Sequence, residues 1–132
     1  MILSASGWRK IFAESGNERD TTTKIGRTNE ILSILIGKTF ASYIQDKLGK
    51  KELKIAVARD TRPTGEIISD CLITALEEEG IKVLYVGIAS APEIMAYAKK
   101  CDGFVYVSAS HNPVGHNGIK FGLSDGGVLE GC

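Results

Sequence analysis

Residues 107–122 read VSASHNPVGHNGIKFG and gather more polar, chemically capable side chains than an ordinary turn requires. The surrounding stretch, 103–124, contains His111, His116 and Lys120 but no carboxylate. A locally cationic stretch suits an anion better than it suits a metal ion held by acidic side chains. The sequence therefore predicts an anion site here, in a chain whose 16 basic and 16 acidic residues cancel.

Ser110 stands at the centre of this stretch, where an apolar strand gives way to a loop. A serine at such a switch can act as a nucleophile or as a phosphate carrier. His111 is too close in sequence to serve as the base of a triad, and G-x-S-x-G is absent, which disfavours an acyl hydrolase. Phosphoryl transfer fits better, because it depends mainly on positioning and positive charge. Taken alone, however, the same residues also read as loop formers, surface histidines and a solvated lysine.

Two other segments carry clustered cations. In Arg59-Asp60-Thr61-Arg62-Pro63, the guanidinium groups either bind a phosphate or brace the turn. Bracing is the favoured reading for Asp60, and both readings stay open for the arginines. Near the amino terminus, residues 4–10 place small side chains before Arg9 and Lys10. Alone, that segment reads as an unremarkable loop with a tryptophan packed on the core.

Apolar periodicity predicts the elements that must position these residues. Helical spacing covers 31–48, with Thr28 or Asn29 as its cap, and 66–79, with Gly80 as its stop. A capping box at Ser90 predicts a third helix that ends at 99–100. Expected strands are 54–58, 81–87, 103–108 and, after an Asn-Gly turn signal, 118–122.

This order of strands and helices predicts an α/β fold, a three-layer α/β/α domain with a mixed, largely parallel sheet whose last strand is antiparallel. In such folds, ligands bind in loops beyond the carboxyl ends of the strands. RDTRPTG, GIASAPE and SASHNP follow three strands, so we expect them to meet at one edge. The polar stretch 14–24 has no period and is expected to be a loop.

Length and composition exclude several classes. A chain of 132 residues is about one domain. Its neutral balance gives no reason to expect nucleic acid or a membrane surface as a partner. Three cysteines without a C-x-x-C pair indicate a reducing compartment, and no signal peptide or long apolar run is seen, so a cytoplasmic protein is predicted. P-loop, dinucleotide and zincin motifs are absent.

Four stretches, read in order, carry a family resemblance: SASGWR, ARDTRPTG, SASHNPVGHNGIK and SDGGVL. Together they resemble the first domain of the α-D-phosphohexomutases, the phosphoglucomutase and phosphomannomutase family. That family's signature is close to T-A-S-H-N-P, then N-G-x-K, then D-G-G. The resemblance implies that residues 1–132 are the phosphoserine-loop domain, a fragment of a longer multidomain enzyme.

The resemblance also implies roles for individual residues. Ser110 would carry the phosphoryl group, and its phosphate would supply one oxygen to Mg²⁺. Arg9 and Lys120 would lie near the transferred phosphate with acid/base or electrostatic duties. His111 and Asn112 match residues of the phosphoserine loop, which implies a catalytic role for His111 and phosphate binding for Asn112. A phosphoserine carries nearly two negative charges at neutral pH, which cationic neighbours would hold.

Some positions depart from the family pattern. Ser6 belongs to S-A-S-G where the family usually has G-T-S-G, and Lys10 replaces a glycine. Both are expected to bind substrate or phosphate, although Lys10 either adds a charge to the site or points outward. Ser108 stands where many members have threonine, as in some phosphoglucosamine mutases. Arg59 and Arg62 match a stretch with a mainly structural role.

The implied activity is that of an isomerase, an intramolecular phosphotransferase of carbohydrate metabolism. Phosphoserine phosphorylates a hexose phosphate, a hexose 1,6-bisphosphate forms and turns, and Ser110 takes back the other phosphate. The family's D-G-D-G-D-R metal loop and its sugar and arginine loops are absent from this sequence. The isolated chain is therefore expected to be inactive, with the remaining domains and a hexose phosphate as partners. Alternatives are a phosphoglucosamine mutase domain or a non-catalytic phosphosugar-binding module.

Overall fold

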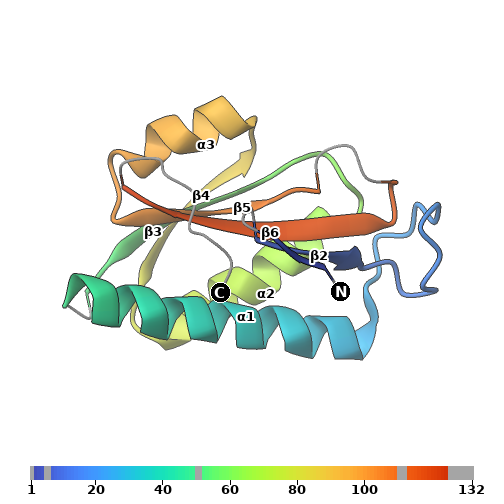
Figure 1. The fold of residues 1–132 in the computed structure, drawn as a ribbon, viewed down its shortest axis with the longest axis horizontal. Helices are drawn as coiled ribbons and strands as arrows, with labels where there is room; N and C mark the ends of the chain where they lie inside the picture. Colours follow the sequence, from blue (N-terminus) through green and yellow to red (C-terminus); the bar gives the residue numbers. More distant parts are fainter. Residues whose placement is uncertain (1, 5–6, 50–51, 110–112, 125–132) are drawn as a thin grey trace.

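Nine elements make up the fold of this chain in a computed structural model, which describes residues 2–4, 7–49, 52–109 and 113–124 (Figure 1). In chain order they are β1 Ile2–Ser4, β2 Gly7–Ile11, α1 Gly26–Leu48, β3 Lys54–Arg59, α2 Gly65–Glu78, β4 Lys82–Ile88, α3 Ala91–Ala98, β5 Gly103–Val107 and β6 His116–Leu123. The alternation of strands and helices expected from the sequence is present from α1 onward.

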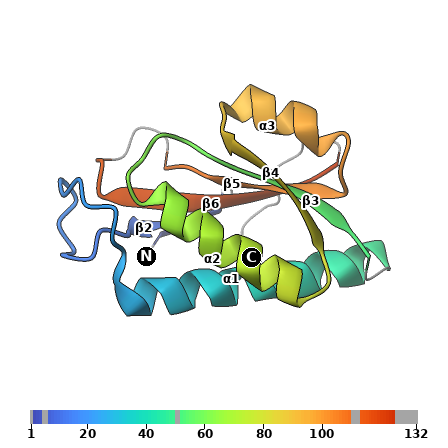
Figure 2. The same cartoon turned by 180° about the vertical axis from the view of Figure 1, so that it is seen from behind.

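The sheet is mixed and six-stranded, with the order β1-β2-β6-β5-β3-β4. Strand β3 runs parallel to β4 and β5, and β6 is antiparallel to β5. Helices α1 and α2 cover one face of the sheet, and α3 covers the other (Figures 1 and 2). The predicted α/β/α layering and the antiparallel last strand are thus confirmed.

The amino-terminal segment was predicted to be a loop, but most of it forms strands. Strands β1 and β2 form a hairpin, in which Ser4 pairs with Gly7, and β2 continues the sheet beside β6. The hairpin supplies the antiparallel half of the sheet together with β6. Short strands with two adjacent cations show no clear period, so it is the backbone pairing with β6 that defines β2.

Two local expectations were also wrong. Helix α1 begins at Gly26 rather than near residue 31, and neither Thr28 nor Asn29 caps it. The Asn29 side chain instead donates to the carbonyls of Phe12 and Ile25, at 3.3 and 2.9 Å. The expected turn at Asn117 does not exist, because this residue lies inside β6 and pairs with Lys10.

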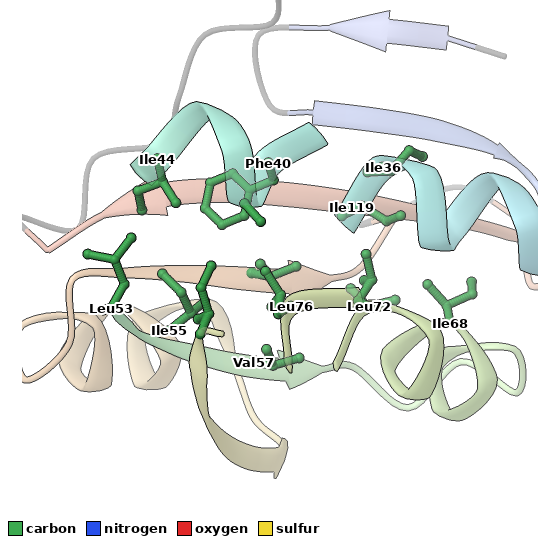
Figure 3. Close-up of a cluster of buried hydrophobic side chains, with 14 of the residues drawn as sticks. Ile36, Phe40, Ile44, Leu53, Ile55, Val57, Ile68, Leu72, Leu76 and Ile119 are labelled. Carbon is green, nitrogen blue, oxygen red and sulfur yellow. The ribbon is translucent and has the colours of Figure 1, made fainter. Parts of the chain in front are cut away.

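A large apolar core lies between the sheet on one side and helices α1 and α2 on the other (Figure 3). Ile36, Phe40 and Ile44 on α1 meet Leu72 and Leu76 on α2, as their helical spacing predicts. Each large side chain that is fully buried contributes roughly 1.5–3 kcal/mol of transfer free energy. A second, smaller cluster on the opposite face joins Ala56, Ala58, Ile94, Ala98, Phe104 and Tyr106.

The ends of α2 and α3 follow the sequence signals. Gly80 adopts φ 81° after α2, donates to the Glu77 carbonyl at 3.0 Å, and lets Ile81 donate to the Leu76 carbonyl at 3.1 Å. Ser90 and Glu93 form the predicted capping box at the start of α3. Among the described residues, no helix is both long and apolar enough to cross a membrane.

Candidate functional site

The three polar loops meet at the carboxyl edge of the parallel strands. The Asp60 N–H donates to the Val107 carbonyl at 3.0 Å, which joins the loop after β3 to the end of β5. The Ala89 N–H donates to the Arg59 carbonyl at 3.0 Å, which joins the loop after β4 to the end of β3. The convergence that was expected from strand order is therefore confirmed.

The described residues on either side of Ser110 lie at this edge. Ser110, His111 and Asn112 themselves lie outside the described residues. The chain leads to them from Ala109, which is fully buried just beyond β5, and leads away through Pro113 to β6. The Ser108 N–H donates to the Gly118 carbonyl at 2.9 Å, so the approach to Ser110 is held against β6.

Arg62 clamps the segment that follows Asn112. Its side chain is nearly buried, and Nη1 donates to the carbonyls of Pro113 and His116 at 2.6 and 3.2 Å. Asp60 orients it, since Asp60 Oδ2 lies 3.4 Å from Arg62 Nε and Asp60 Oδ1 accepts from the Arg62 N–H at 3.0 Å. Of the two roles left open for this arginine, bracing is the one that the geometry supports.

The other arginine of this loop stays beside its own strand. Arg59 Nε donates to the Tyr85 hydroxyl, and Nη1 donates to the Asp60 carbonyl, both at 3.3 Å. The first of these bonds ties the end of β3 to β4. Arg59 thus also contributes to the shape of the edge.

Asn117 is a positioning residue that the sequence did not reveal. It is fully buried, as is Thr64 at the start of α2, and its Nδ2 donates to the Thr64 hydroxyl at 3.0 Å. Its Oδ1 accepts from the Gly118 N–H at 2.9 Å. Its sequence signals were its place in the N-G-x-K stretch and the Asn-Gly dipeptide, and this dipeptide indicates a turn far more often than a buried amide in a strand.

Lys120 lies on the face of the sheet that α3 covers in part. It pairs with Tyr106, and its ammonium nitrogen is 6.0 Å from the centre of the Tyr106 ring. The backbone of Arg9 pairs with Gly118, two residues before Lys120. The Arg9 side chain and Ser6 lie outside what the structure describes.

Lys10 takes a different direction from Lys120. It pairs with Asn117, on the face that packs against α1, and its ammonium group donates to Asn29 Oδ1 at 2.6 Å. It also lies 5.7 Å from the centre of the Phe12 ring. The ammonium group therefore braces the start of α1, and this geometry lends no support to the expected phosphate contact.

His116 meets a carboxylate that is distant in sequence. Its Nε2 lies 3.5 Å from Glu18 Oε2, so the stretch without acidic residues of its own receives one from the loop after β2. Within residues 2–4, 7–49, 52–109 and 113–124, no group of three acidic, histidine or cysteine side chains could hold a metal ion. At this edge the described cations therefore lie beside carboxylates, Arg62 beside Asp60 and His116 beside Glu18.

Tyr106 allows a pH test of the surroundings of Lys120. Burial, and then the charge of Asp60, raise the pKa of the Tyr106 hydroxyl above its ordinary value of 10.0, while the hydroxyl donates to the Ala89 carbonyl at 2.7 Å. A raised pKa in the folded state means that stability is fully present below pH 10.0 and falls as pH rises through the folded value. We expect Tyr106→Phe to lose about 1 kcal/mol near neutral pH and to show a smaller alkaline loss than the wild type.

Urea unfolding of both proteins over this range measures the effect, because lysine titration is common to the two and cancels in the comparison. Equal alkaline losses in the two proteins would contradict the assignment.

Known proteins resemble this chain in sequence. Residues 3–131 match the family described as phosphoglucomutase/phosphomannomutase, alpha/beta/alpha domain I. A probable phosphoglucosamine mutase from Methanosphaera stadtmanae is 32% identical over 120 residues, which are 89% of this chain and 25% of that protein. A phosphoglucosamine mutase from Listeria welshimeri is 49% identical over 102 residues, 75% of this chain and 22% of that protein.

A solved structure of this family has a similar fold. A phosphoglucomutase/phosphomannomutase family protein from Burkholderia thailandensis superposes with a TM-score of 0.70 at 23% identity, covering 92% of this chain and 26% of that one. The chain thus spans about a quarter of the length of these proteins. By its sequence match and its layered fold, the chain belongs to the phosphoglucomutase/phosphomannomutase family and carries the family's domain I.

Proposed function

We propose that this chain is the phosphoserine domain of a phosphohexomutase, and that Ser110 carries a phosphoryl group between O1 and O6 of a hexose phosphate. The observation that supports the proposal is the position of the described residues on either side of Ser110. Residues 108–109 follow β5 at the edge where three loops converge, and Arg62 holds Pro113 and His116 on the other side. Open α/β sheets bind their ligands at such an edge.

The proposed reaction consists of two phosphoryl transfers. In the first, a sugar hydroxyl attacks the phosphorus, the bond between phosphorus and Ser110 Oγ breaks, and the proton of the sugar hydroxyl passes to a base. The resulting hexose 1,6-bisphosphate turns around. In the second, Ser110 Oγ attacks the other phosphate, the bond to that sugar oxygen breaks, and the oxygen takes up a proton. Phosphate is conserved, and the sugar phosphate is isomerised.

The proposed roles of this chain follow from charge. Lys120 and Arg9 stabilise the equatorial oxygens during transfer, and the pairing of β2 with β6 brings their backbones close together. His111, Asn112 and Ser6 contribute hydrogen bonds to the phosphate. These roles are suggested by the sequence resemblance, and the pairing of β2 with β6 is a separate observation that is compatible with them.

The proposed metal ion is Mg²⁺. The described residues offer no cluster that could hold it by themselves, and the ligand that we propose from this chain is an oxygen of the Ser110 phosphate. The other ligands, as well as sugar recognition, would come from further domains of the same protein, which in the relatives occupy the remaining three quarters of the length. Cytoplasmic sugar phosphates are the proposed substrates.

Glucosamine phosphate is the first hexose phosphate to test. The most similar curated proteins described above are named phosphoglucosamine mutases, and Ser108 agrees with some of these enzymes. Glucose and mannose phosphates are the comparison substrates. If the domain instead binds phosphosugars without catalysis, the protein will bind them and turn over none of the three.

Phosphate mapping tests the role of Ser110 directly. After incubation of the enzyme that carries this chain with a hexose 1,6-bisphosphate, we expect mass spectrometry to find phosphate on the peptide that contains Ser110. Ser124, an exposed serine just beyond β6, provides an internal control that should remain unmodified. Phosphate found reproducibly on another residue of active enzyme would overturn the assignment.

A further inference from the structure

The loop after β2 makes its closest contact with the segment that follows Ser110. We name residues 13–24 the brace loop. The Gly115 N–H donates to the Glu18 carbonyl at 2.7 Å. The Gly115 carbonyl accepts from the N–H groups of Phe12 and Ala13, at 2.9 and 3.2 Å. Both backbone polar groups of Gly115 are therefore engaged by one stretch of chain about a hundred positions earlier in the sequence.

Gly115 has no room for a side chain at this contact. A Cβ atom would lie 2.5 Å from the carbonyl oxygen of Asn17 and 2.9 Å from the carbonyl carbon and oxygen of Glu18. These are backbone atoms, so no rotamer change can relieve the overlap. The φ angle of Gly115 lies outside the left-handed region, and the close approach of the two backbones is what requires glycine here.

The brace loop has its own internal hydrogen bonds. The Ser15 hydroxyl donates to Asp20 Oδ2 at 2.6 Å, and Asp20 Oδ1 accepts from the Thr22 N–H at 2.9 Å. These bonds lower the pKa of the Asp20 carboxyl below its ordinary value, the bond from Ser15 being the larger cause. The Arg19 N–H donates to Asn17 Oδ1 at 2.9 Å. Short side-chain-to-backbone bonds of this kind hold a turn in one shape.

A hydrogen bond also joins the two ends of the brace loop. The Glu14 N–H donates to the Lys24 carbonyl at 2.9 Å. Asn29 joins the carbonyls of Phe12 and Ile25, and Lys10 in turn donates to Asn29. The loop is therefore anchored on β2 and α1, and it presents the Glu18 carbonyl to Gly115 from a fixed base.

We propose that the brace loop is a positioning element for the phosphoryl carrier. Residues 113–116 are held by Arg62 through the carbonyls of Pro113 and His116, and by the brace loop through Gly115. Ser110 stands five residues before Gly115, so this double hold defines where its loop returns to the sheet. The inference rests on the proposed function of Ser110, because it concerns the orientation needed for transfer.

The expected consequence is a loss of turnover when the hold is loosened. Phosphoryl transfer requires an in-line approach, and misplacing the reacting group by ~1 Å costs up to about 100-fold in rate. The first test variant is Gly115→Ala, which forces the two backbones apart. The second is the double variant Ser15→Ala with Asp20→Ala, which loosens the brace loop without adding atoms to the contact.

A matched glycine control is available at the far end of α1. Gly49 follows that helix with φ 65°, and a Cβ placed there would meet nothing within 4 Å. Gly49→Ala therefore adds the same methyl group and some backbone strain, but leaves the brace loop untouched. It should lower thermal stability slightly and leave both readouts below unchanged.

The two readouts are the hydrogen-exchange rate of the backbone amide at position 115, taken relative to the intrinsic rate of the residue there, and kcat and KM of the enzyme that carries this chain. In both test variants we expect exchange at least about tenfold faster, kcat per folded molecule about 10- to 100-fold lower, and KM within about twofold of wild type. Faster exchange with unchanged kcat per folded molecule would overturn the positioning role, because a purely structural contact would behave in that way.

Failure of the proposed function has a different signature. Wild-type enzyme that turns over none of the three hexose phosphates would remove the mutase assignment before any variant is compared. The hold on Gly115 would then be judged by exchange alone, and an unchanged exchange rate in Gly115→Ala would overturn it as well.

Discussion

Ser110→Ala is expected to abolish phosphohexomutase turnover in the enzyme that carries this chain, with a loss on the order of 10⁴-fold or more, the scale seen when a covalent nucleophile is removed. Alanine has no oxygen to accept or release the phosphoryl group, so the two-step route is closed. Substrate binding should persist, because the cations around the phosphate remain. Steady-state assays with glucosamine, glucose and mannose phosphates measure the effect.

Ser124→Ala provides the matched control for this experiment. Ser124 is an exposed serine just after β6, and the substitution removes the same hydroxyl group. Its kcat should equal that of wild type. Thermal melting of both variants should agree with wild type, since surface and loop substitutions usually change stability by less than ~0.5 kcal/mol. Turnover by Ser110→Ala above a tenth of the wild-type rate would rule out the carrier role.

Arg62→Leu is expected to have the largest effect on folding, a loss of about 3 kcal/mol in the free energy of unfolding. The carbonyls of Pro113 and His116 lose a charged donor, and hydrogen bonds to charged groups contribute roughly 1.5–3 kcal/mol each. Asp60 also loses its guanidinium partner, although its own side chain is partly exposed and water screens part of this loss. Activity per folded molecule should fall too, since the clamp on the segment after Ser110 is gone.

Arg62→Lys separates charge from geometry. Lysine keeps the positive charge but cannot bridge two carbonyls and Asp60 with one planar group, so we expect it to restore less than half of the stability lost in Arg62→Leu. Arg27→Leu serves as the control, because Arg27 is exposed on α1. Urea unfolding gives the free energies. An Arg62→Leu protein as stable as the Arg27→Leu protein would show that the clamp does not hold the fold together.

Local sequence patterns were enough to predict the elements whose apolar residues recur at a regular spacing. Of the apolar residues at helical spacing in 31–48, Ile36, Phe40 and Ile44 are buried as predicted, whereas Ile31, Leu35 and Leu48 are exposed. The Ser90 capping box and the Gly80 stop appear at the expected helix ends. Such signals act between residues three or four positions apart, so they are readable in one dimension. The convergence of three loops at one edge followed from strand order alone.

The hairpin of β1 and β2 could not be predicted from such local patterns. Its short strands carry no alternation, and β2 becomes a strand because β6, more than a hundred residues later, offers unpaired backbone groups. The turn expected at Asn117 was wrong for the same reason. An Asn-Gly pair favours a turn locally, but Asn117 pairs with Lys10 in the sheet and its side-chain amide donates to Thr64 at the start of α2.

What the sequence by itself determined about this protein is its layered α/β fold, its family and the residue proposed as carrier, since periodicity and short motifs are local properties. Only the tertiary structure decided that Arg62 clamps Pro113 and His116, that Glu18 meets His116, and that Lys10 and Lys120 face opposite sides of the sheet. These contacts join residues tens of positions apart or more. Their partners depend on sheet order and strand register, which a single linear pattern does not contain.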